Sequence, residues 1–198
     1  MKLHVHKKAF RALGISESFV KRKSEKSVLA GVVMRADKTI DGVVFAEATV
    51  GGMDATNSVI EMFKTLGRDD INVLLLNGCI ISWYNVIDLH KVSKETNLPL
   101  ICVTYEESEG LDKYFKKLFP EDYKTRIKLY HRNKKRIQLS LKSGYKVYVR
   151  FIGMTMEEAK EVLDKFTLQG AISEPLRVSR LLARAVSKTL LPKYMKEF

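Results

Sequence analysis

Residues 71–79 read INVLLLNGC, and this stretch decides the fold class. A short apolar run climbs out of a polar loop and ends at Asn77 and Gly78. Strands that are apolar on both faces are typical of the middle of a parallel sheet, and α/β proteins bind ligands at the carboxyl ends of such strands. The stretch therefore predicts an α/β protein with an uncharged amide, Asn77, at the tip of a central strand.

The residues that follow alternate between strand and helix patterns. Residues 82–96 (SWYNVIDLHKVSKET) carry apolar side chains at helical spacing, and residues 99–105 (PLICVTY) read as a buried strand. Residues 109–119 predict another helix, which ends near Pro120. This alternation predicts parallel pairing with right-handed crossovers.

The residues that precede the stretch predict an antiparallel meander. Strand patterns cover residues 11–19, 28–34 and 40–50, with short polar connections between them. A helical stripe follows the glycine pair at 51–52. Three antiparallel strands followed by two parallel ones form a mixed sheet, and this order is the ribonuclease H-like arrangement.

The last third of the chain predicts a basic extension. RIKLYH (126–131), RIQLSLK (136–142) and YKVYVRFI (145–152) all read as strands, and the last two are joined by a turn at Ser143 and Gly144. The interpretation is a single ribonuclease H-like domain over residues 1–198, with a basic hairpin insertion at about 124–152 and C-terminal helices.

Signals of helix ends mark those C-terminal helices. TMEE (155–158) is a capping-box pattern and predicts a helix that runs to about residue 168. Gly170 is expected to stop it, and Pro175 to start the last helix.

Composition restricts the class of protein and of partner. The chain has 35 Lys and Arg against 23 Asp and Glu, for a net charge of +12. This excess favours DNA or RNA as a partner, because bound phosphates release counterions. No run approaches a membrane span and the first residues lack a signal-peptide pattern, so we expect a cytoplasmic protein with no membrane contact. Cys79 and Cys102 are expected to be buried free thiols.

Short segments spread along the chain carry a family resemblance. They are LGISESF (13–19), IDGVV (40–44), MDAT (53–56), LLLNGCIISWYNVIDL (74–89), TNLPLICV (96–103) and EPLRVSRLLA (174–183). In their order and spacing the chain resembles the largely archaeal, uncharacterised family catalogued as domain of unknown function ninety-nine. That family is regarded as a remote relative of endonuclease V, within the ribonuclease H-like folds.

The resemblance implies a metal site whose acidic ligands are replaced here. Endonuclease V-like enzymes cut a phosphodiester with Mg²⁺ held by carboxylates. Where the family has Gly-Ile-Asp-Asp, this chain has Ser16 in place of the first Asp, and where it has Asp-Gly, this chain has Asn77. The stretch EPLRVSR is similar to Glu-Pro-x-Arg-x-x-Asp, with Arg180 at its last position. The resemblance thus implies a degenerate site that repels divalent cations and attracts phosphate. No cofactor is expected, and Mg²⁺ only if activity is retained.

Other acidic residues leave an alternative open. Glu17, Asp54 and Asp88 are possible remnant ligands of a Mg²⁺-dependent endonuclease. Asp54 equally suits a helix cap beside the glycine turn, and Asp88 suits either a helix start or a cleft wall. A third interpretation is a non-enzymatic module that binds a partner. His4 and His6 alternate as chelating residues do, but exposed terminal residues are the commoner case.

Two basic stretches predict nucleic-acid contact. The first set lies among the tyrosines of residues 124–150, a mixture that suits single-stranded nucleic acid. The second recurs at three- and four-residue steps on the last helix and forms one stripe. The predicted binding residues are Lys128, Arg132, Lys134, Lys135, Arg136, Arg177, Arg180, Arg184 and Lys188. The alternative interpretation is a solvated edge hairpin and a solvated helix face.

Overall fold

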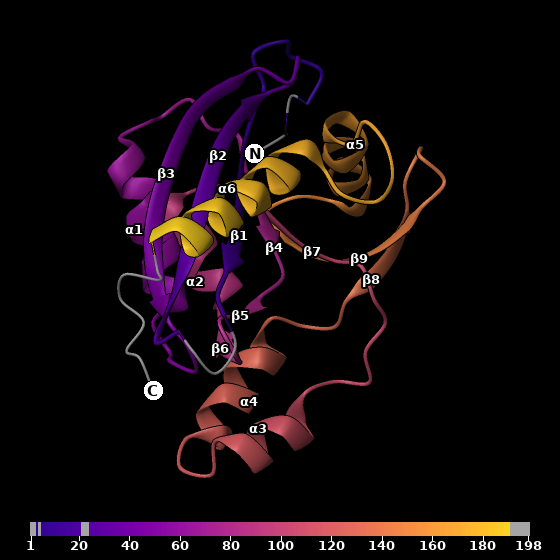
Figure 1. Cartoon of the computed structure of the whole chain (residues 1–198). Coiled ribbons are helices and arrows are strands. Elements are labelled where there is room, and N and C mark those ends of the chain that lie inside the picture. The colour runs from indigo at the N-terminus through magenta and orange to yellow at the C-terminus, as the bar shows by residue number, and fades with distance from the viewer. Residues whose placement is uncertain (1–2, 4, 21–23, 191–198) are drawn as a thin grey trace.

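A seven-stranded mixed sheet forms the centre of the computed structural model, which describes residues 3, 5–20 and 24–190 (Figure 1). Its strand order is β3-β2-β1-β4-β7-β9-β8. The strands are β1 (Arg11–Ser18), β2 (Lys26–Arg35), β3 (Ile40–Thr49), β4 (Val73–Asn77), β7 (Leu100–Thr104), β8 (Ile137–Ser140) and β9 (Lys146–Ile152). The predicted meander of β1 to β3 is confirmed, as is the parallel pairing of β4 with β1 and of β7 with β4. The antiparallel hairpin β8–β9 extends the sheet beyond β7.

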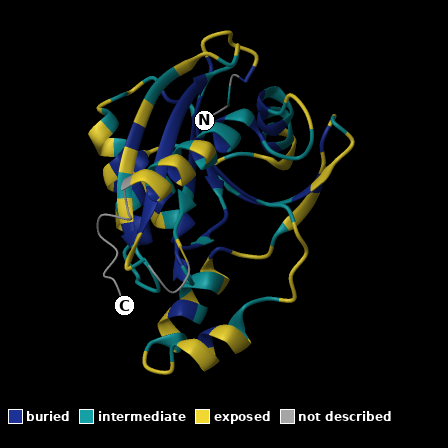
Figure 2. Cartoon of the chain, viewed as in Figure 1, coloured by how far each residue is buried: buried dark blue, intermediate teal, exposed yellow. Residues whose placement is uncertain are grey.

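The sheet lies between two layers of helices. α1 (Ala55–Leu66) and α2 (Leu89–Thr96) cover one face, and α5 (Met156–Phe166) and α6 (Glu174–Leu190) cover the other. Figure 2 shows the central strands as a buried layer between them. In β4, Leu74 and Leu76 pack with the first helix layer, whereas Val73 and Leu75 pack with the second. This double burial explains why the four successive residues 73–76 are all apolar.

The last helix begins in direct contact with the backbone of β1. A Cβ atom at Gly14 would lie 2.6 Å from the carbonyl carbon of Pro175, closer than side-chain atoms come. With α6 in this position, only glycine fits at position 14. The contact positions the first turns of α6 over the carboxyl end of β1.

The signals of helix ends in the C-terminal part are largely confirmed. Thr155 and Glu158 form the predicted capping box of α5, with each side chain bonded to the other's backbone N–H. Pro175 lies in the first turn of α6, as predicted. α5 ends at Phe166, before Gly170, so the predicted stop at Gly170 is wrong.

Two predicted elements are wrong. Residues 126–131 are not a strand but part of α4 (Tyr123–Arg132), which packs with α3 (Asp112–Leu118). The basic insertion is therefore a helix followed by a hairpin. Residues 82–88 are not helical, because β5 (Ile80–Ile81) and β6 (Asn85–Val86) pair as a small separate sheet there, and α2 begins only at Leu89. Within the residues described, no helix has the length and apolar character needed to cross a bilayer.

Candidate functional site

A pocket of about 710 Å³ opens where the carboxyl ends of β4 and β7 meet α6 and the basic hairpin. It lies beyond the tips of parallel strands, the place where α/β sheets bind ligands. Its polar lining consists of Asn77, Thr104, Tyr105, Glu106, Glu107, Ser108, Tyr130, Arg136, Arg150, Arg177 and Arg180. Four arginines against two glutamates give this pocket an excess of positive charge.

Two of these arginines are held in place largely by backbone carbonyl oxygens. The nearly buried Arg150 donates to the Lys134 carbonyl at 2.7 Å and to Cys79 Sγ at 3.4 Å. Arg136 donates to the carbonyl oxygens of Glu106 and Ser108, at 2.8 and 3.1 Å. Carbonyl acceptors fix a guanidinium in place without neutralising it. Both residues are therefore oriented cations, ready for an anion.

The charge of Arg177 is partly balanced. Its Nε donates to Glu174 at 3.2 Å, which forms a local ion pair in the first turn of α6. Its Nη2 donates to the carbonyl oxygen of Gln169, also at 3.2 Å. Arg177 therefore helps to fix the segment before α6 as well as lining the pocket.

The structure brings together the three positions that the resemblance singled out, but only two face the pocket. Asn77 and Arg180 both line it. Ser16 is buried between β1 and α6, where its hydroxyl donates to the Leu176 carbonyl at 3.1 Å and accepts from Ser179 Oγ at 2.8 Å. The position of a family carboxylate is thus closed by a neutral hydrogen-bonded contact.

The possible remnant carboxylates are separated from one another by their own contacts. Asp54 follows β3 and accepts hydrogen bonds from Thr49 and Asn85. Burial alone would raise the pKa of Asp54, but these hydrogen bonds lower it below the ordinary value. Asp54 occupies the N-cap position of α1, as the sequence allowed, but its side chain makes no capping hydrogen bond.

Asp88 starts α2, one of the two roles that the sequence left open. Its Oδ1 accepts from the Lys91 backbone N–H at 3.0 Å, and its Oδ2 accepts from Arg132 at 2.9 Å. Asp88 is not among the residues that line the pocket. Arg132, predicted to bind nucleic acid, is here the partner of a buried carboxylate.

Glu17 keeps one carboxylate oxygen buried and without a hydrogen-bond partner. Burial raises the pKa of Glu17 above its ordinary value, and a backbone hydrogen bond from Ser82 opposes that shift. In the described part of the chain, no three His, Cys, Asp or Glu side chains gather as a metal site would need. As they are placed here, Glu17, Asp54 and Asp88 do not form the set of ligands that a Mg²⁺ centre needs.

The predicted basic residues divide between this pocket and its surroundings. Lys134, Lys135 and Arg136 line a neighbouring hollow of about 550 Å³, which shares Arg136 and Arg150 with the first pocket. Lys128, Arg184 and Lys188 are exposed and lie outside both hollows.

For His6, the structure agrees with the favoured interpretation of an exposed terminal residue. His4 lies outside the described residues, and His6 is exposed and contacts Glu161 at 3.0 Å.

Sequence reasoning missed two features of the pocket. Tyr105 directly follows β7, so the rule that ligands bind at strand tips would have found it; its hydroxyl is buried with no hydrogen-bond partner in the described residues. Burial raises the pKa of Tyr105, whereas the charges of Arg180 and Arg177 oppose that shift.

The second missed feature concerns Cys79, which lines the pocket. Cys79 and Cys102 are confirmed as buried free thiols. A hydrogen bond with the Cys102 thiol, helped by the Arg150 charge, lowers the pKa of Cys79 to about 7. The same thiol contact and burial raise the pKa of Cys102. No sequence motif signals this pair.

A family model and curated relatives both match nearly the whole chain. A family model described as Endonuclease dU matches residues 8–187. A UPF0215 protein of Pyrobaculum calidifontis is 36% identical over 179 residues, covering 90% of this chain and 97% of its own. A UPF0215 protein of Pyrococcus horikoshii is 31% identical over 184 residues, covering 91% and 93%.

Solved structures show the same fold. A protein of unknown function from Archaeoglobus fulgidus superposes with a TM-score of 0.77 and 26% identity, covering 89% of this chain and 98% of its own. The catalytic domain of human endonuclease V gives 0.63 and 16%, covering 97% and 89%. Endonuclease V of Ciona intestinalis, in complex with inosine-containing DNA, gives 0.59 and 16%, covering 91% and 87%. The predicted ribonuclease H-like fold is confirmed by these likenesses.

Proposed function

The chain belongs to the endonuclease dU family, and from this we propose that it binds DNA or RNA through the arginine-lined pocket, with a degenerate metal site. The family's name describes an endonuclease, but the three positions where the resemblance expects metal-binding carboxylates hold Ser16, Asn77 and Arg180 in this chain. The equivalence of this family with domain of unknown function ninety-nine stays a prediction.

The observation that carries the proposal is the cluster of four arginines at the tips of β4 and β7. Guanidinium groups match phosphate oxygens in charge and in bidentate geometry. Arg136 and Arg150 are fixed by carbonyl and sulfur acceptors, so they lose little freedom when a phosphate binds. A phosphodiester is therefore the ligand class that this pocket suits best.

The second hollow favours a polymer over a small anion. It continues the first pocket through Arg136 and Arg150 and adds Lys134 and Lys135. A row of cations along two adjoining hollows suits successive phosphates of one strand. The likeness to an endonuclease V that was solved with DNA supports the same class of partner.

The loss of cleavage is supported by what replaces the carboxylates. Arg180 adds a positive charge beside Asn77, and a cation there repels a second cation such as Mg²⁺. Ser16 is engaged with α6 and does not face the pocket. Asp54 and Asp88 are engaged in local contacts, which argues against their service as substitute ligands.

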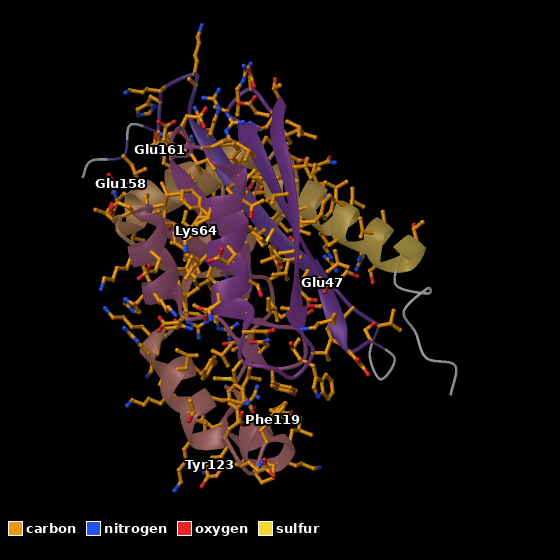
Figure 3. The ribbon with its side chains drawn as sticks, turned by 90° about the vertical axis from the view of Figure 1, so that its left-hand side faces the viewer. Glu47, Lys64, Phe119, Tyr123, Glu158 and Glu161 are labelled. Carbon is orange, nitrogen blue, oxygen red and sulfur yellow. The ribbon has the colours of Figure 1, made fainter. Side chains whose placement is uncertain are left out.

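A salt titration tests binding. Fluorescence anisotropy of labelled single-stranded and double-stranded oligonucleotides would be measured from about 50 to 300 mM salt. We expect log K to fall linearly with log salt concentration, and Arg180→Gln to weaken binding and to reduce the slope by about 0.7–0.9. Lys64→Gln is the matched control, because Lys64 is exposed on α1 at the opposite face of the sheet (Figure 3).

The outcomes separate the three interpretations. Binding that does not respond to salt or to Arg180→Gln would contradict the proposal and favour a module for another partner. Cleavage of the oligonucleotide that requires Mg²⁺ and disappears in Asp54→Ala would instead establish the endonuclease with substitute ligands.

A further inference from the structure

Three successive residues in the turn between β5 and β6 have left-handed backbones. Ser82, Trp83 and Tyr84 have φ values of 47°, 57° and 65°, and none of them is glycine. Side-chain-bearing residues adopt this region rarely, and a run of three requires surrounding structure that enforces it. The turn is therefore held for a reason other than local preference.

Both ends of this turn are clamped. The Ser82 hydroxyl is hydrogen-bonded to that of Ser27, and the Ser82 carbonyl accepts from the Gly51 N–H at 2.7 Å. At the other end the buried Arg126 donates to the Tyr84 carbonyl at 2.8 Å. The clamps fix the backbone that carries Trp83 and Tyr84.

The turn presents aromatic rings in fixed order. Trp83 meets Tyr84 edge to face at 5.3 Å between centroids, and Tyr84 stacks on Tyr114 of α3 at 6.2 Å and 26°. Trp83 and Tyr84 are partly exposed, and Tyr114 is 42% exposed. These three residues, termed the aromatic platform, offer ring surface to solvent at one edge of the protein.

A row of rings connects the platform with the arginine-lined pocket. Tyr130 lines that pocket below the Arg150 guanidinium, 5.3 Å from it. Phe115 lies between Tyr130 and Tyr84, with centroid distances of 5.9 and 5.7 Å. A strand whose phosphates occupy the pocket therefore has a platform within reach.

Lysines of α3 accompany the platform, and one of them, Lys113, also contacts Glu109 at 3.7 Å. The Lys113 ammonium lies over the Tyr114 ring at 5.4 Å, and Lys116 and Lys117 are exposed on the same helix. Figure 3 places Phe119, which follows this helix, at the end of the molecule away from α5. Rings among lysines suit a base with its phosphates better than an apolar protein surface.

We propose that Trp83, Tyr84 and Tyr114 stack an unpaired base of the strand that the pocket binds. The inference rests on the proposed function and narrows its substrate to nucleic acid with single-stranded character. Only an unstacked base can offer its face to an aromatic side chain, whereas bases inside a duplex stack on one another.

Trp83 gives the inference a direct readout, since it is the only tryptophan of the chain. A single-stranded oligonucleotide and an abasic strand of equal length are titrated into the intact protein, with anisotropy and tryptophan emission recorded together. We expect both strands to bind, and only the strand with bases to quench the emission. Equal emission changes from both strands would overturn the inference and leave the proposed function standing.

A variant of the aromatic platform tests base stacking independently of the emission measurement. Tyr114→Leu removes an exposed ring and is expected to weaken binding of the base-bearing strand by about 5- to 100-fold, with the abasic strand unaffected. Phe45→Leu is the matched control, because Phe45 is 45% exposed on the distant edge strand β3. Equal losses for both strands would contradict base stacking. If neither strand binds the unmodified protein, the proposed function fails and the inference with it.

Discussion

Ser16 Oγ lies 2.8 Å from Ser179 Oγ and accepts its hydroxyl proton, and Ser16 in turn donates to the carbonyl oxygen of Leu176 at 3.1 Å. This small polar knot joins β1 to α6 immediately beside Arg180. It fills the place where the family resemblance expects a carboxylate. The knot explains how the chain remains stable without a metal there, because each buried hydroxyl has a partner.

Ser16→Asp is expected to lower the free energy of unfolding at pH 7 by about 2–4 kcal/mol, because it buries a charge against a carbonyl oxygen. Burial raises the pKa of such a carboxyl, so the loss should shrink as pH falls and the group becomes neutral. Urea unfolding at pH 7 and pH 5 measures this. Ser16→Ala, the control, should lose about 1 kcal/mol at both values. A stable Ser16→Asp variant that binds Mg²⁺ would contradict this account of the site.

Asp54→Asn is expected to cost about 1 kcal/mol at neutral pH, a modest value because the Asp54 side chain is 40% exposed. The folded protein holds the pKa of Asp54 below its ordinary value. Its contribution is therefore complete above the unfolded pKa of about 3.9 and disappears as pH falls through the folded pKa. Unfolding curves of both proteins should thus converge under acid conditions. A difference that grew with acid would show that the sign is wrong.

Arg126→Met is expected to lower the free energy of unfolding by about 3–5 kcal/mol. Arg126 is nearly buried and donates to the carbonyl oxygens of Gly51, Gly52 and Tyr84 as well as to Asp122. Its removal leaves these acceptors without a donor. Lys128→Met, two residues away but exposed, should change stability by less than about 0.5 kcal/mol. Equal effects in chemical denaturation would show that the clamp is not structural.

Lys134→Gly is expected to separate stability from binding. Lys134 is exposed with a φ of 61°, a value that glycine adopts without strain. Its carbonyl still accepts from Arg150 after the change, so the free energy of unfolding should rise by up to about 1 kcal/mol. Oligonucleotide affinity should fall, because one cation of the second hollow is lost. Denaturation and anisotropy on one preparation measure both, and affinity unchanged at low salt would exclude Lys134 from the interface.

The strands of the sheet can be predicted from the sequence because the central ones are buried on both faces and are therefore apolar. Elements whose buried residues are polar cannot be predicted in this way. In α4 the only buried residue is Arg126, so no apolar stripe marks a helix there. Ile127 and Leu129 alternate with polar residues, and this alternation is typical of a strand. The turn at Ser82–Tyr84 was assigned to a helix because its conformation is imposed by contacts distant in sequence, which no local pattern reports.

The site could be predicted in part, and only through the family resemblance. Asn77 and Arg180 do share one pocket, as the converging segments implied. Arg184 and Lys188 continue the stripe beyond it, because a helix 17 residues long extends past the strand tips. The Cys79–Cys102 contact and the buried Tyr105 hydroxyl depend on three-dimensional neighbours, and the spacing of these residues contains no trace of them.

The contact between Gly14 and Pro175 has a consequence for how this protein can change. Since α6 rests on bare backbone, bulk added beneath it must tilt the whole helix, and the arginines it carries would swing away from the strand tips. Arg177 and Arg180 both lie on α6, so a change beneath this helix is expected to move the two guanidinium groups together.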